Sequence, residues 1–80
     1  MEPSIGRIVH YILSDGRSPG EHRPAIIVKI WNPDMLQLQV FTDGSNDGDV
    51  YKSGVFWATS VYYADPSEKK FHTWHWPERV

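Results

Sequence analysis

The sequence predicts a small all-β domain built from five short strands. Six glycines and six prolines divide the 80-residue chain into short segments rich in β-branched and aromatic residues. Several segments alternate apolar and polar side chains with the period of two that a half-buried strand requires. No segment has the pattern of a helix of useful length.

The first predicted strand covers residues 5–13. Ile8 and Ile12 lie on one of its faces, and the opposite face is formed by Val9, Tyr11 and Leu13. A loop follows over residues 14–20, because its Ser, Asp, Gly and Pro residues favour turns.

The second predicted strand covers residues 25–31 and the third covers residues 35–42. The second is apolar nearly throughout, as expected of a central strand, and Pro24 stands at its start, where a missing N–H is tolerated. A tight turn at Asn32-Pro33-Asp34 joins the two into a hairpin. The third strand alternates between two faces, one with Leu36, Leu38 and Val40, the other with Gln37, Gln39 and Phe41.

The fourth predicted strand covers residues 54–63. Strict alternation along it places Trp57 on the face of Val55 and Val61. A solvated turn over residues 65–70 leads to the last strand.

The fifth predicted strand covers residues 71–76, and Pro77 ends it. Trp74 and Trp76 share one face, and His75 lies on the other. If the tryptophan face points inward, Trp74 belongs to the core and Trp76 closes one end of the fold. If that face points outward, the two indoles form a shelf for stacking.

Five short strands with a long first loop and a tight second turn resemble the strand order of an SH3-like barrel. Residues 1–80 are therefore predicted to form a single domain of this kind. So short a chain has a thin stability margin, and it has no cysteine for disulfides or thiolate metal sites. Assembly into a homo-oligomer is therefore one open way for it to gain stability.

The formal net charge of −2 argues against a protein that binds long nucleic acid along its phosphate backbone. A small anionic ligand needs only one or two local cations and is compatible with this charge. The chain shows no secretory leader and no apolar run long enough to span a membrane. A cytoplasmic protein without a membrane partner is expected.

Residues 43–49 form a polar loop whose beginning matches the spacing of an EF-hand calcium loop. The match ends at Gly54, which stands where calcium coordination requires a bidentate glutamate. Two interpretations remain open. The loop is a hairpin connection that caps its own backbone, or it binds a ligand through Asp43, Ser45, Asn46 and Asp47.

The four histidines form no recognisable metal motif. His72 and His75 are three residues apart, which in a strand places them on opposite faces. His10 and His22 would join them only through the tertiary fold. Ser60 lies in a predicted strand and not in the strained turn of a nucleophile. The sequence therefore assigns no metal ligand, no cofactor and no catalytic residue, and it favours a protein that is not an enzyme.

Four tryptophans are more than a core of this size encloses easily, because each indole is large and needs a partner for its N–H when buried. One or two indole faces are therefore expected at a surface groove or an interface. A nucleobase stacked on such a face contributes about 1–3 kcal/mol. Trp57 and Trp76 are the candidates for stacking, and Trp31 is expected to anchor a turn.

Three segments resemble sequences of small, uncharacterised proteins that are common in tailed phages and prophages. They are QVFTDGSND (residues 39–47), WATSV (57–61) and TWHWPE (73–78). The resemblance implies a phage origin, action in the host bacterial cytoplasm, an SH3-like barrel and self-association. Phage proteins of similar size and architecture include sponges, which sequester the nucleotide signals of bacterial immunity.

These observations predict a non-enzymatic phage protein that sequesters a small nucleotide-derived ligand, such as a cyclic-nucleotide or ADP-ribose-type immune signal, to counter host defence. The predicted ligand-binding residues are Arg23, Phe41, Asp43, Ser45, Asn46, Asp47, Trp57, Thr59, Ser60, His75 and Trp76. Three alternatives stay open: an SH3-like module that binds a host or phage protein, a protein for single-stranded nucleic acid, and a nucleotide-cleaving enzyme.

Overall fold

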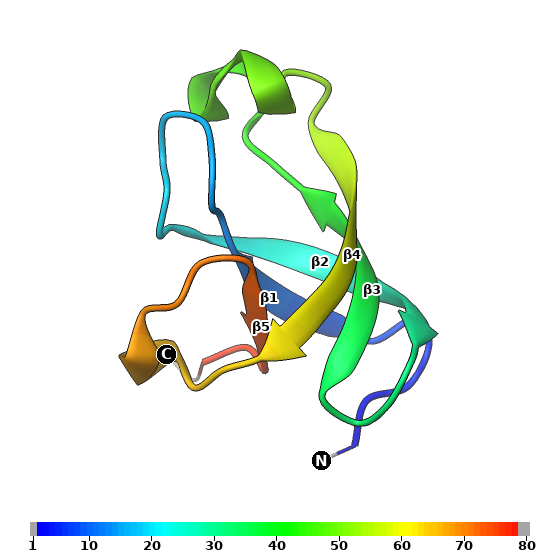
Figure 1. Cartoon of the computed structure of the whole chain (residues 1–80). Helices are drawn as coiled ribbons and strands as arrows, with labels where there is room; N and C mark the ends of the chain where they lie inside the picture. The colour runs from blue at the N-terminus through cyan, green and yellow to red at the C-terminus, as the bar shows by residue number, and fades with distance from the viewer. Residues whose placement is uncertain (1, 79–80) are drawn as a thin grey trace.

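The computed structural model describes residues 2–78 as five strands that close into one barrel in the order β1-β2-β3-β4-β5 (Figure 1). The strands are β1 (Ile8–Ile12), β2 (His22–Ile30), β3 (Met35–Phe41), β4 (Val55–Tyr63) and β5 (Thr73–His75). Neighbouring strands are antiparallel except β4 and β5, which run parallel. The predicted all-β class is confirmed, and the architecture is that of a small SH3-like barrel.

The core consists of inward side chains from every strand. Its fully enclosed members include Val9, Tyr11, Leu13, Ala25, Ile27, Leu36, Leu38, Val40, Val61 and Trp74. The inward faces are formed by Leu36, Leu38 and Val40 in β3 and by Val9, Tyr11 and Leu13 at β1, so each of these predicted groupings is confirmed. On the opposite face of β1, Ile8 is exposed but Ile12 is buried.

The tryptophan face of β5 points inward. The indole N–H of Trp74 donates to the backbone carbonyl of Asp34 at 2.9 Å, so this buried ring has the partner that it needs. Trp76 is half-buried and packs edge-on against Trp74, with ring centroids 5.5 Å apart. The inward alternative from the sequence is therefore the correct one.

The side chains of β4 switch faces part-way along the strand, so the prediction that Trp57 shares the face of Val61 is wrong. Val61 is fully buried, whereas the side chain of Trp57 is 56% exposed. Between them Ser60 adopts a left-handed φ of 54°, and the β3–β4 register shifts in the same region. An irregularity of this kind moves every later side chain to the opposite face.

β2 begins at His22, earlier than predicted, so Pro24 lies inside the strand and not at its start. This proline stands opposite His10 of β1. It is tolerated because β2 pairs with β3 only from Ala25 onward, so no ladder bond from that side requires an N–H here. The earlier start makes His22 part of the sheet.

β5 is shorter than predicted. His72, immediately before it, has a left-handed φ of 56°, which interrupts extended structure. Its ring lies 2.6 Å from the Tyr11 hydroxyl, through Nδ1, and so helps to close this side of the barrel.

The polar loop after β3 folds into two short 3₁₀ turns, η1 (Gly44–Asp47) and η2 (Asp49–Tyr51). It packs against the loop after β1, and both lie at one end of the barrel (Figure 1). A Cβ at Gly16 would meet the backbone oxygen of Asp47 at 2.1 Å, and Gly16 has a φ of +75°. Glycine is therefore required where these two loops touch.

Candidate metal centre

Three histidines meet on the outer surface of the barrel, where β1 lies between β2 and β5. His10 stands opposite His75 in the β1–β5 pair, and His22 stands opposite Ile12, two residues along β1 from His10. Residues two apart on a strand share a face. The three imidazoles consequently project to the same side, with ring centroids 4.7 to 6.0 Å apart.

Glu78 brings a carboxylate between these rings, three residues after the end of β5. Its Oε1 accepts hydrogen bonds from His10 Nδ1 at 2.9 Å and from His75 Nε2 at 2.8 Å. Its Oε2 lies 3.1 Å from His22 Nδ1. The four side chains form one contiguous group, called here the His/Glu cluster.

The spacing of the His/Glu cluster suits a single metal ion. One ligand atom from each of the four residues can be chosen so that all lie within 4.8 Å of one another. Tetrahedral zinc with bonds of about 2.0–2.2 Å holds its ligand atoms roughly 3.3 Å apart. The side chains of His10, His22 and Glu78 are 30%, 34% and 42% exposed, so they have room for the small rotations that separate these two geometries.

The pKa shifts of His75 and Glu78 also suit a metal ion. Burial lowers the pKa of His75, and its hydrogen bond to Glu78 offsets only part of that effect. Desolvation opposes ionisation of Glu78, but hydrogen bonds from His75 and His10 outweigh it and hold the pKa of that carboxyl at about 2. Neutral imidazole and ionised carboxylate are the forms that coordinate metals.

His75 carries a further sign of a specialised role. Its side chain is only 1% exposed, and its Nδ1 atom is buried without a hydrogen-bond partner among residues 2–78. Leaving a buried polar atom unpaired costs about 1–3 kcal/mol. A valine or leucine at this position would avoid that cost, so packing alone does not account for a histidine here.

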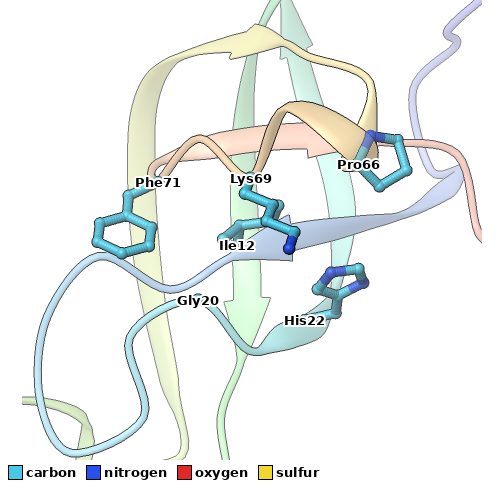
Figure 2. A pocket seen from close by; sticks show the side chains of 6 residues that line it. All are labelled: Ile12, Gly20, His22, Pro66, Lys69 and Phe71. Atoms are coloured by element: carbon cyan, nitrogen blue, oxygen red, sulfur yellow. The ribbon is translucent and has the colours of Figure 1, made fainter.

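A pocket of about 470 Å³ borders the cluster (Figure 2). It is lined by Ile12, Gly20, His22, Pro66, Lys69 and Phe71. His22 belongs to both the pocket and the cluster, so a ligand in the pocket would lie beside the His/Glu cluster.

The structure places Asp47 and Arg23, two of the predicted ligand-binding residues, in contact with each other. Arg23 donates from Nε at 2.8 Å and from Nη2 at 2.5 Å to the two carboxylate oxygens of Asp47, which is 1% exposed. The backbone N–H of Asp43 donates to the same carboxylate at 2.7 Å. This pair ties the loop after β3 to the start of β2.

Asp43, Ser45 and Asn46 lie exposed in the same loop. The side-chain amide of Asn46 approaches the Asp43 carboxylate at 3.4 Å, and the backbone N–H of Asn46 donates to the carbonyl of Asp43. Asp47 caps loop backbone at Asp43, whereas neither short turn has a side-chain hydrogen bond at its N-cap. The outer side chains of the loop remain accessible.

Phe41, Trp57 and Thr59 lie on the outer face of the β3–β4 hairpin, with Ser60 at its irregular point. Phe41 is 39% exposed and Trp57 is 56% exposed. Thr59 donates through its hydroxyl to Gln37, whose Oε1 also accepts the indole N–H of Trp31 at 3.0 Å. These residues form an accessible aromatic and polar surface.

His75 and Trp76 complete the predicted set, and they point to opposite sides of the chain. His75 belongs to the His/Glu cluster, whereas Trp76 lines a second pocket of about 350 Å³ with Tyr63 and Pro33. The eleven predicted residues thus fall in several parts of the fold, and the structure does not gather all of them around one ligand.

The sequence interpretation missed His10, His22 and Glu78. His72 lies outside the cluster, as predicted, although it precedes β5 and is not part of the strand. The signal in the sequence that could have found His10 was strand alternation. His10 lies on the face of β1 opposite the core residues Val9 and Tyr11 and therefore points outward. The pairing of β1 with β5, which brings His10 to His75, was not visible in the sequence.

No protein-family model, curated protein or solved structure matches this chain. Across residues 2–78, no helix has the length and apolar character needed to cross a membrane.

Proposed function

We propose that this domain binds a transition-metal ion, best matched by Zn²⁺, through His10, His22, His75 and Glu78. The observation that carries the proposal is the convergence of three imidazoles and one carboxylate from separate parts of the chain, with ligand atoms within 4.8 Å. Imidazole nitrogen favours zinc and its neighbours in the first transition series, whereas Mg²⁺ and Ca²⁺ favour all-oxygen sites.

Four protein ligands fill a tetrahedral site, which is the arrangement of structural zinc. An ion here would join β1, β2 and β5 to the segment that carries Glu78. Small domains gain stability from such links because their cores are limited. The metal ion would therefore mainly stabilise the β1–β5 seam, the line along which these two strands pair.

The test is titration of the purified, metal-free protein with Co²⁺ and Zn²⁺. Tetrahedral Co²⁺ gives intense visible absorption, so we expect a spectrum that saturates at one equivalent and is displaced by Zn²⁺. His10→Ala and Glu78→Gln each remove one ligand and should weaken Zn²⁺ binding by at least roughly tenfold, as loss of groups at metal sites typically does.

His72→Gln is the matched control, because it removes a histidine that lies outside the cluster. It should retain the Co²⁺ spectrum. Binding that is unchanged in His10→Ala and Glu78→Gln, or wild-type protein that takes up no Zn²⁺ at micromolar concentration, would refute the metal site.

The outer face of the β3–β4 hairpin supports a second candidate function, the capture of a small nucleotide-like ligand. Trp57 is 56% exposed, and Phe41 lies on the same face, diagonally across the β3–β4 pair. Exposed aromatic rings of this kind stack on nucleobases. Self-association, a phage origin and a role against host defence remain predictions from the sequence that accompany this candidate.

Trp57→Ala tests the second candidate. Loss of one stacking ring should weaken nucleotide binding by about 1–3 kcal/mol, roughly 5- to 150-fold. Isothermal titration with cyclic dinucleotides and ADP-ribose would measure it. Trp31→Ala is the control, since Trp31 is a comparably exposed indole that the prediction places outside the site. Equal affinity in wild type and Trp57→Ala would exclude stacking on this face.

A further inference from the structure

The pocket beside the His/Glu cluster has walls of two kinds. Ile12, Pro66 and Phe71 supply apolar surface, and Lys69 supplies a cation (Figure 2). Figure 2 shows the Lys69 side chain extending from its turn into the space between Phe71 and His22. A volume of about 470 Å³ falls within the range of small-molecule sites.

Lys69 is held in an unusual backbone conformation. It follows η3 (Pro66–Glu68) with a left-handed φ of 54°, which is uncommon for a residue with a side chain. A capping box between Asp65 and Glu68 fixes the turn that precedes it. The same turn thus carries Pro66 into one wall and directs Lys69 over the pocket.

The Lys69 ammonium has no carboxylate partner among residues 2–78. Its neighbour Lys70 pairs with Glu68 at 3.3 Å, and Arg23 pairs with Glu21 and Asp47. Within residues 2–78, the imidazole of His22 is the only other ionisable group that lines the pocket. The charge on Lys69 is therefore available to a ligand.

We propose that this pocket binds a small organic acid, with its apolar body against Ile12, Pro66 and Phe71 and its carboxylate at Lys69. One cation above a mainly apolar cavity matches a monoanion with an apolar body. A phosphate dianion would instead need several donors or cations. A neutral apolar molecule would leave Lys69 without a partner.

His22 links this ligand to the metal, and this part of the inference rests on the proposed function. A metal ion on Nδ1 of His22 would fix the ring that forms one wall of the pocket. A wall that is already ordered costs less free energy to bind against. Metal and organic acid should therefore strengthen each other's binding by the same factor.

The experiment measures binding of 4-fluorobenzoate by ¹⁹F NMR, with 4-fluorobenzamide as the uncharged probe of nearly equal shape. Both are titrated into metal-free and Zn²⁺-loaded wild-type protein. Lys69→Met removes the charge and keeps the aliphatic chain, and Lys70→Met is its matched control outside the pocket. Phe71→Ala removes apolar wall from a residue that is 54% exposed and therefore tolerant of truncation.

We expect 4-fluorobenzoate to bind more tightly than the amide, and Lys69→Met to weaken the acid roughly two- to fivefold, the range for an exposed ion pair. The amide should lose nothing in Lys69→Met, and both probes should weaken in Phe71→Ala. Equal binding of acid and amide, or equal effects of Lys69→Met and Lys70→Met, would overturn the assignment.

His10→Ala separates the two proposals, because His10 is a proposed metal ligand and does not line the pocket. This variant should bind Zn²⁺ more weakly and keep the affinity of the metal-free protein for 4-fluorobenzoate. Zn²⁺ uptake without any binding of 4-fluorobenzoate would overturn the pocket and leave the metal site standing. Binding of the acid to a protein that takes up no Zn²⁺ would support the pocket and refute the metal site. Equal affinity with and without Zn²⁺ in a protein that binds both would overturn the coupling through His22.

Discussion

Asp47 shows how one side chain can organise a polar loop. Its carboxylate is buried and accepts two hydrogen bonds from Arg23 and one from the backbone of Asp43. The hydrogen bonds from Arg23 outweigh the opposing effect of burial and lower the pKa of Asp47 to about 2. The loop whose composition left a ligand-binding role open is therefore held at Asp47 by an ion pair to Arg23 of β2.

Asp47→Asn should destabilise the domain by about 1.5–3 kcal/mol at pH 7, the usual value of hydrogen bonds to a charged group. The folded pKa lies below the unfolded value of about 4, so the contribution is complete above about pH 4 and is lost as pH falls through about 2. Urea unfolding of wild type and variant across this range should show their stability difference shrinking as pH falls.

Asp49→Asn is the control for that series, because Asp49 is exposed in the same loop. This substitution should change the free energy of unfolding very little at every pH. A difference between wild type and Asp47→Asn that stays constant from pH 7 to pH 2 would argue against the ion pair as its origin.

Among the elements, β4 is the strand whose structure departs from the alternation in its sequence. Alternation predicts which core residues share a face in β1 and β3, although Ile12 and Gln37 on the opposite faces are buried as well. In β4 the left-handed Ser60 reverses the phase, so Trp57 is exposed while Val61 is buried. Nothing in the sequence around Ser60, which lacks Gly and Asn, marks it as a left-handed position.

Ser60→Val tests that irregularity. A β-branched residue is strongly disfavoured at positive φ, and we expect a loss of about 1–2 kcal/mol. In a domain of this size that loss lowers the melting temperature by roughly 4–16 °C. Ser60→Gly should keep or raise the melting temperature, since glycine accepts this φ without strain. A valine variant as stable as the glycine variant would mean that the position is extended.

At the scale of the whole molecule, composition and strand pattern predict the number of strands and the barrel, but not the contacts that close it. β1 meets β5 through His10 and Tyr11 opposite His75 and Trp74, residues far apart in the sequence. Register across such a gap is decided by packing of the complete core, to which Trp74 belongs. The candidate metal ligands depend on this pairing and on that of β1 with β2, which places His22 opposite Ile12. Alternation along β1 therefore predicts the direction of His10 but not its neighbours.

The β1–β5 seam also has a consequence for the time course of folding. Contacts between residues this distant require closure of nearly the whole chain, which makes them slow to form. Interactions that form after the transition state change the unfolding rate and leave the folding rate almost unaltered. A metal ion bound across the seam should therefore slow unfolding and leave the folding rate almost unchanged.

Stopped-flow urea jumps would measure this effect. Zn²⁺ at a hundred times its Kd adds about 2.7 kcal/mol, which corresponds to roughly hundredfold slower unfolding with refolding nearly constant. If Zn²⁺ instead speeds refolding by a similar factor, β1 and β5 pair before the folding transition state. The position of three histidines on a barrel thus bears on how long the folded molecule persists, as well as on what it binds.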